Sequence, residues 1–103
     1  MLVGVCRIKL YFPECGSLKA KRHNLRRIVE RTKAKFNAAV AEVSGQDSWQ
    51  RADIGVVVVG NETPHVQSML DNIVGFVEQM YVGQVMEREI DLLSYNDQES
   101  LGE

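Results

Sequence analysis

Residues 50–60 read Gln-Arg-Ala-Asp-Ile-Gly-Val-Val-Val-Val-Gly, and this stretch is the strongest strand signal in the chain. The run of β-branched residues between two glycines predicts a buried strand. The next four residues, Asn61-Glu62-Thr63-Pro64, are typical of a helix start. Asn61 or Thr63 can cap the helix with its side chain, and the missing N–H of Pro64 is harmless in a first turn. A strand that leads directly into a helix is therefore the unit from which we predict the rest of the fold.

Downstream of this unit the sequence predicts one helix and one strand. Apolar residues follow the i, i+3, i+4 spacing of a helix at Val66, Met69, Leu70, Ile73, Val74, Val77 and Met80. Residues 84–93 then predict a last strand. Residues 94–103 are polar and acidic, and we expect a disordered tail there. The folded part is thus predicted to be one domain of residues 1–93.

Upstream of the unit the pattern is strand, helix, strand. Residues 2–12 alternate in polarity, as a strand does. Ser17 offers an N-cap for a helix that runs to about Phe36, and residues 38–43 predict a short strand. The order β-α-β-β-α-β predicts a ferredoxin-like two-layer sandwich of class α+β. Right-handed crossovers then imply four antiparallel strands in the order 4-1-3-2, with both helices on one face.

The charge of the chain is distributed unevenly. The 103 residues include 12 Lys and Arg and 14 Asp and Glu, for a net charge of -2. Residues 1–36 hold ten of the basic residues and two of the acidic ones, so that the remainder is strongly acidic. Part of this charge can be balanced inside the predicted sheet, where opposite charges on neighbouring strands attract weakly. The residues concerned are Arg7 and Lys9 on the first strand and Glu87, Glu89 and Asp91 on the last.

The first predicted helix is the main candidate functional site. Its only acid is Glu30, which we expect to pair with Arg26. Basic side chains spread over a helix can bind the phosphate backbone of a nucleic acid. The predicted RNA-binding residues are Lys19, Lys21, Arg22, Arg26, Arg27, Arg31, Lys33 and Lys35. A solvated helix balanced by the acidic remainder of the protein, or by a partner, is the alternative. A helix on a membrane surface is disfavoured, because its apolar stripe is needed to pack on the sheet.

The sheet itself is not expected to bind bases. Recognition of RNA on a sheet surface needs aromatic residues on the central strands, and only Tyr11 is predicted to face outward there. The outer face carries valines instead, at Val3, Val5, Val40, Val57 and Val59. A contiguous apolar face predicts a partner, most simply a second copy of the chain. A strand that merely happens to be rich in valine is the alternative.

Several other classes of function are disfavoured. No apolar run approaches the roughly 18 residues of a membrane span, and the first residues do not resemble a signal peptide. Cys6 and Cys15 are isolated, which argues for reduced thiols in a cytoplasmic protein rather than a metal or iron–sulfur site. We therefore expect no metal, no cofactor and no catalytic residues. A hydrolase or transferase stays open only if His65, Asp53 and Glu62 converge.

Two local features carry weaker hypotheses. Cys15, in a turn near the basic helix, is the more plausible reactive thiol. Trp49 either covers the edge of the sheet, with Arg51 and Glu42 in pairing range, or forms a contact surface together with Arg51.

The chain also resembles the YlxP-like family of small bacterial proteins of unknown function. The resemblance covers about residues 1–92 and is carried by Ser17-Leu18-Lys19-Ala20-Lys21-Arg22 and Trp49-Gln50-Arg51-Ala52, supported by Val3-Gly4-Val5, Phe36-Asn37, Ala41-Glu42-Val43 and Gly55-Val56-Val57-Val58-Val59. It implies a ferredoxin-like fold, a cytoplasmic bacterial protein and no established enzymatic activity. Members of the family tend to be encoded near translation-initiation and ribosome-maturation factors, which implies a role around the ribosome.

The residues and the resemblance together predict a non-enzymatic factor that binds ribosomal RNA or a ribosomal subunit through its basic helix. The alternative is a small dimeric protein-interaction or regulatory module that does not bind nucleic acid.

Overall fold

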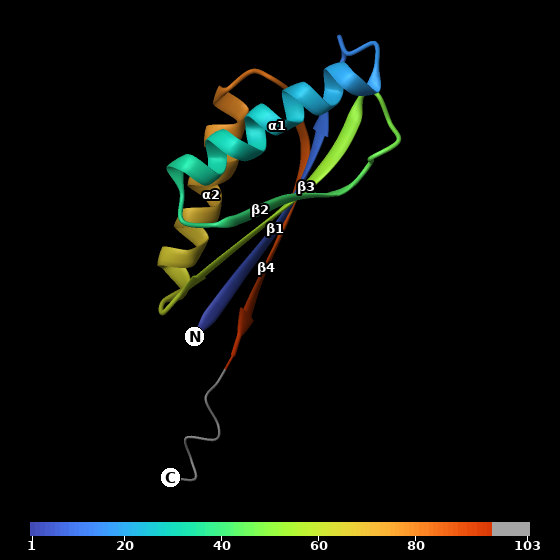
Figure 1. The fold of residues 1–103 in the computed structure, drawn as a ribbon. Coiled ribbons are helices and arrows are strands. Elements are labelled where there is room, and N and C mark those ends of the chain that lie inside the picture. The colour runs from blue at the N-terminus through green and yellow to red at the C-terminus, as the bar shows by residue number, and fades with distance from the viewer. Residues whose placement is uncertain (96–103) are drawn as a thin grey trace, which may run out of the picture.

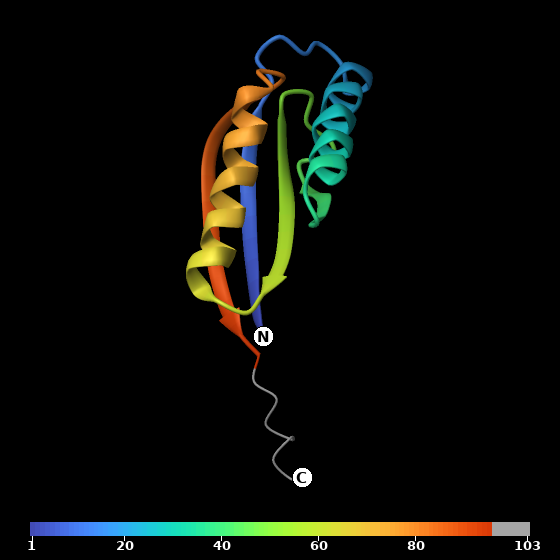
Figure 2. The same ribbon diagram turned by 90° about the vertical axis from the view of Figure 1, so that its left-hand side faces the viewer.

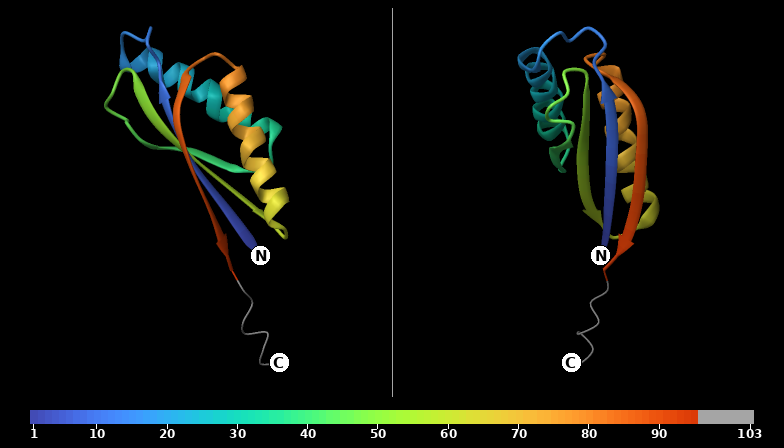
Figure 3. Two further views of the ribbon diagram at one scale, coloured as in Figure 1. Left: turned by 180° about the vertical axis from the view of Figure 1, so that it is seen from behind. Right: turned by 90° about the vertical axis from the view of Figure 1, so that its right-hand side faces the viewer.

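The computed structural model describes residues 1–95 as six elements in the order β-α-β-β-α-β (Figure 1). They are β1 (Leu2–Tyr11), α1 (Leu18–Lys35), β2 (Ala39–Ser44), β3 (Arg51–Gly60), α2 (Thr63–Gln79) and β4 (Gln84–Ser94). The strands form one antiparallel sheet in the order β2-β3-β1-β4, which confirms the predicted order. Both helices cover one face of the sheet (Figure 2), and β1 and β4 lie in front of α2 when the sheet is viewed from the other side (Figure 3, right).

The core lies between the sheet and the two helices. Every second side chain of β1 and β3 points into it, as the alternation predicted, and Ile8, Ile54 and Val56 are fully buried there. The apolar stripe of α2 packs on these strands, and its residues Val66, Leu70, Ile73, Val74 and Val77 are all completely buried. The predicted helix periodicity of residues 66–80 therefore identifies the buried face of α2 correctly.

Gly4 sets how closely α2 approaches β1. A Cβ atom at this position would lie 2.6 Å from Cγ1 of Val66 and 2.9 Å from Cδ1 of Leu70. These distances are shorter than van der Waals contact, so a larger residue would force α2 away from the sheet.

The helix starts follow the predictions in part. Ser17 caps α1, because its Oγ accepts a hydrogen bond from the N–H of Ala20 at 3.1 Å. The cap residue of α2 is Glu62, whose side chain makes no capping hydrogen bond, so the predicted cap at Asn61 or Thr63 was wrong. Pro64 lies in the first turn of α2, as predicted.

The predicted charge rows on β1 and β4 form only partly. Lys9 Nζ lies 3.7 Å from Glu87 Oε1, which is the expected cross-strand pair. Arg7 turns instead to β3, where its Nε donates to Asp53 Oδ2 at 2.9 Å. Glu89 and Asp91 are exposed on β4 beside Arg7 and Val5.

One residue of the predicted outer valine face is in the core. Val40 pairs with Val56 in the sheet and is only 6% exposed, so its assignment to the outer face was wrong. By the same alternation Glu42 points inward, as Val40 does. Its carboxylate can lie there because it forms a salt bridge with Lys21 of α1. The outer patch therefore consists of Val3, Val5, Val57 and Val59, joined by Leu93, which pairs with Val3 on β4.

The predicted boundary between domain and tail falls close to the end of the described residues. Ser94 belongs to β4, and the N–H of Tyr95 donates to the carbonyl of Met1 at 2.8 Å. The rest of the predicted tail, residues 96–103, lies outside the described residues.

Candidate functional site

Seven basic side chains are exposed on α1, and they define what we call the basic face. They are Lys19, Arg22, Arg26, Arg27, Arg31, Lys33 and Lys35. Glu30 is the only acidic residue of the helix. Among residues 1–95 the salt bridges are Arg7–Asp53, Lys9–Glu87, Lys21–Glu42 and Arg88–Asp71. No residue of the basic face takes part in one, and even the expected pair of Arg26 with Glu30 does not form.

Lys21 is the one predicted phosphate contact that the structure removes from this surface. Its side chain is fully buried, and its Nζ donates to the carbonyl oxygens of Gly45 at 2.7 Å and of Arg51 at 3.2 Å. The same nitrogen lies 3.4 Å from Oε2 of Glu42. A buried ammonium group needs such partners, because it has lost its water. Lys21 is therefore a structural residue that fastens α1 to the β2–β3 hairpin.

The sequence held a signal for this role. Lys21 stands at positions i, i+4, i+7 and i+11 with Leu25, Ile28 and Thr32, which are the other buried residues of α1. A residue in that register faces the sheet. Its charge, rather than its position, suggested exposure.

Lys35 is the last residue of the basic face and of α1. Its Nζ lies 5.9 Å from the ring centre of Phe36 and 5.7 Å from that of Phe76 on α2, within cation–π range. The positive charges of Lys33 and Lys35 also interact favourably with the negative, C-terminal end of the helix dipole. Part of the positive charge in the last turn thus has a structural use.

The remaining charge on α1 is unfavourable for the helix itself. Arg27, Arg31 and Lys35 are spaced four residues apart, and like charges at this spacing destabilise a helix by about 0.2–0.5 kcal/mol per pair. Arg22 and Arg26 repeat the arrangement on the other flank of the helix. Such a surface can bind an extended polyanion, because each cation can neutralise a phosphate and release its counterion.

The β2–β3 turn, residues 45–50, lies at the same end of the molecule as the start of α1 (Figures 1 and 2). It is held from two sides. Lys21 binds it from α1, while the N–H of Phe12 donates to the carbonyl of Gln50 at 2.8 Å and Gln50 Nε2 donates to the carbonyl of Pro13 at 3.0 Å. Gly45 adopts a φ of +90°, which favours glycine.

Trp49 is exposed on this turn and does not cover the sheet edge closely. It is 55% exposed. The Oγ of Ser48 accepts hydrogen bonds from the N–H groups of Gln50 and Arg51. Next to the turn, the Arg51 guanidinium lies 5.7 Å from the ring centre of Tyr11. The expected pairing of Arg51 with Glu42 does not form, because Glu42 pairs with Lys21.

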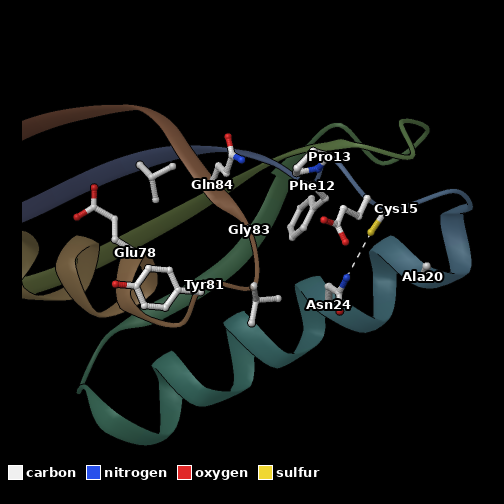
Figure 4. Close-up of a pocket in the computed structure, with 12 residues that line it drawn as sticks. Phe12, Pro13, Cys15, Ala20, Asn24, Glu78, Tyr81, Gly83 and Gln84 are labelled. Carbon is white, nitrogen blue, oxygen red and sulfur yellow. Dashed lines mark hydrogen bonds between the residues drawn. The ribbon is translucent and has the colours of Figure 1, made fainter.

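A cavity lies between the β1–α1 loop, α1 and the α2–β4 loop (Figure 4). Its volume is about 630 Å³, and its walls include Phe12, Cys15, Asn24 and Tyr81. The Asn24 amide donates to Cys15 Sγ at 3.3 Å, so this thiol is hydrogen-bonded at the wall of the cavity. Cys6, in contrast, is inside the core, and burial raises the pKa of its thiol.

The residues considered for a hydrolase or transferase do not converge. Glu62 and His65 line a second cavity of about 300 Å³ at the start of α2, with no hydrogen bond between their side chains among the described residues. Asp53 is held by Arg7 on the outer face of the sheet. Residues 1–95 contain no cluster of three metal-ligating side chains, and neither of their helices is long and apolar enough to cross a bilayer.

The element order, the strand order and the one-sided helix layer define a ferredoxin-like α+β sandwich. The chain belongs to the family described as "Protein of unknown function (DUF503)", whose model matches residues 3–90. It is 31% identical over 77 residues to the "Uncharacterized protein YlxP" of Bacillus subtilis (strain 168), an alignment that covers 75% of this chain and 84% of that protein. The resemblance to the YlxP-like family is thereby confirmed.

Solved structures with the same fold share little sequence with the chain. A de novo designed protein with ferredoxin fold, LFR1 1, has a TM-score of 0.53 at 12% identity. The alignment covers 94% of this chain and 88% of the designed protein. The structure of a "Putative Chlorite dismutase TA0507" has a TM-score of 0.55 at 7% identity. The alignment covers 98% of this chain but only 48% of that protein's chain. These likenesses show the fold alone, and no catalytic residue is carried over from them.

Proposed function

We propose that this protein is a non-enzymatic, cytoplasmic RNA-binding factor that docks on ribosomal RNA or a ribosomal subunit through the basic face of α1. The observation that carries the proposal is the set of seven exposed cations with no salt bridge to any described carboxylate. The residues that would contact phosphates are Lys19, Arg22, Arg26, Arg27, Arg31, Lys33 and Lys35.

The acidic residues elsewhere in the chain support this function over a merely solvated helix. The described carboxylates that do form salt bridges pair with Arg7, Lys9, Lys21 and Arg88, none of which belongs to the basic face. The carboxylates that form salt bridges among residues 1–95 therefore pair with cations outside the basic face, and the like charges of α1 remain next to one another. An external polyanion is the partner that would relieve this repulsion.

Binding to ribosomal subunits over a salt series tests the proposal. We expect co-sedimentation at low salt that weakens steeply as salt rises, because phosphate binding releases counterions. The variant Arg26→Glu/Lys33→Glu reverses two charges that lie two helical turns apart on one flank. It should weaken binding roughly tenfold or more at low salt.

A matched control separates the basic face from net charge. Lys9→Glu/Arg88→Glu makes the same change in net charge on β1 and β4, away from α1, and should keep most of the affinity. Absence of binding at low salt, or equal losses in the two double variants, would contradict the proposal.

The second candidate is a dimeric interaction module, and the outer apolar patch favours it. Val57 and Val59 are 38% and 57% exposed, and Leu93 is 55% exposed next to them. A second copy packing sheet to sheet would remove this apolar surface from water. Such a dimer leaves the basic face free, so that dimerisation and RNA binding are compatible.

A further inference from the structure

Trp49 is an exposed aromatic residue on the β2–β3 turn. It is the only tryptophan of the chain, and more than half of its surface is open to solvent. A lone exposed apolar residue is ordinary on a protein surface. Trp49 differs because hydrogen bonds from α1 and from Phe12, directly after β1, hold the turn that carries it.

The turn is held by a lysine that is costly to bury. Lys21 donates to carbonyl groups on both sides of Trp49 in the sequence, those of Gly45 and Arg51. Ser48 Oγ and the backbone bond from the Ser48 N–H to the carbonyl of Gly45, at 3.0 Å, fix the turn internally. An exposed aromatic ring on a rigid support loses little conformational entropy when a flat partner stacks on it.

Lys21 also places the turn beside the basic face. Lys19 and Arg22, which lie within two positions of Lys21 on α1, are exposed cations, and Lys21 itself contacts the turn. Arg51, at the other end of the turn, is a further exposed cation, but it lies on the outer face of the sheet, with its guanidinium 5.7 Å from the ring centre of Tyr11. Cations beside an exposed aromatic ring are the arrangement by which proteins hold single-stranded nucleic acid, with phosphates on the cations and bases on the rings.

We propose that Trp49 stacks on an unpaired base of the RNA whose backbone lies along the basic face. This inference rests on the proposed function and names its substrate class, a single-stranded RNA segment rather than a continuous duplex. Bases in a duplex are already stacked on each other, whereas those of a loop or single strand are free to stack on a side chain.

The fluorescence of the single tryptophan reports directly on this contact. The probe is a single-stranded oligoribonucleotide of about ten nucleotides, compared with a duplex RNA of the same length at the same low salt concentration. We expect the single strand to quench the emission of Trp49 on binding. We expect the duplex to bind through the basic face without comparable quenching.

Substitutions read by the anisotropy of a labelled strand complete the test. Trp49→Ala should weaken binding of the single strand roughly 5- to 100-fold, and Trp49→Phe should retain much of the affinity, because a phenyl ring also stacks. Tyr95→Ala is the matched control, since it removes another exposed aromatic residue at the opposite end of β1. It should leave the affinity unchanged.

Failure of this inference differs from failure of the proposed function. If the single strand binds in a manner that depends on Arg26 and Lys33, while Trp49→Ala has wild-type affinity and the emission does not change, the stacking contact is overturned and the basic face stands. If neither RNA binds at low salt, both proposals are overturned. Equal quenching by the single strand and the duplex overturns the preference for unpaired bases.

Discussion

Lys21 and Glu42 form a salt bridge of 3.4 Å in which the lysine side chain is fully buried and the glutamate side chain is 24% exposed. The pair joins the first turns of α1 to β2, and the lysine bonds to Gly45 and Arg51 extend the connection to the β2–β3 turn. One buried side chain thus links the candidate basic face to the turn that carries Trp49.

Removing this lysine should destabilise the protein. Lys21→Met keeps the apolar stem but leaves two carbonyl groups and a partly buried carboxylate without their donor. We expect a loss of about 3 kcal/mol in the free energy of unfolding, measured by urea denaturation. The control is Lys19→Met on the exposed side of the same helix, which should change stability by less than about 0.5 kcal/mol. Similar losses in the two variants would contradict the structural role of Lys21.

Arg31→Glu should stabilise the fold while weakening RNA binding. It replaces repulsion of Arg27 and Lys35 by two attractive i, i+4 pairs, which we expect to raise the free energy of unfolding by about 1 kcal/mol at low salt. The gain should shrink near 1 M salt, where the Debye length is only about 3 Å. Urea denaturation at two salt concentrations measures it. A loss of stability at low salt would show that the charges of α1 do not repel one another.

The outer patch predicts a dimer that a single charge disrupts. Val59→Lys places an ammonium group within the apolar patch, and we expect the molecular mass measured by light scattering to fall from that of a dimer to that of a monomer. Met86→Lys on β4, at a residue of nearly equal exposure, should leave the mass unchanged. A monomeric parent protein would refute dimerisation through this face.

Two glycines should respond to alanine in opposite directions. Gly4→Ala puts a methyl group against Val66 and Leu70, and overpacking of this kind lowers stability by about 1–3 kcal/mol. At Gly75, inside α2, an added Cβ meets no atom within 4 Å. Gly75→Ala should therefore raise stability by up to about 1 kcal/mol through helix propensity, as thermal or urea unfolding will show.

The two thiols should differ in reactivity. Burial raises the pKa of Cys6, so this thiol stays protonated in the folded protein when a free thiol begins to ionise. Its contribution to stability is complete at neutral pH and declines as the pH rises past the ordinary pKa, because the unfolded chain then loses the proton first. In single-cysteine variants, a thiol reagent at pH 8 should label Cys15, at the cavity wall, at least about tenfold faster than Cys6. Equal rates would contradict the effect of burial on the pKa of the Cys6 thiol.

Patterns along single elements were enough to predict the fold. The alternation of β1, the valine run of β3 and the helix spacing of α2 each report burial of one element against the core. The order of these elements then limited the topology to one sheet arrangement.

Two of the errors, at Lys21 and at Val40, share one cause, which is a contact between distant parts of the chain. Glu42 shares the inner face of β2 with Val40, and an unpaired carboxylate would not be tolerated there. The partner that makes it acceptable is Lys21, which is 21 residues away in the sequence. Without that contact, Lys21 is read as an exposed cation and Val40 as an outer residue. The same lysine also holds the turn that carries Trp49.

Because both helices lie on one side of the sheet, the cations of α1 and the carboxylates of Glu87, Glu89 and Asp91 lie on opposite sides of the molecule. The exposed positive charge of the described residues is therefore concentrated on α1, even though the net charge of the chain is small. In the field of a polyanion such a molecule rotates until α1 leads, and oriented approach accelerates productive encounters. If α1 binds RNA as proposed, the arrangement of the helices would affect the rate of association as well as the affinity.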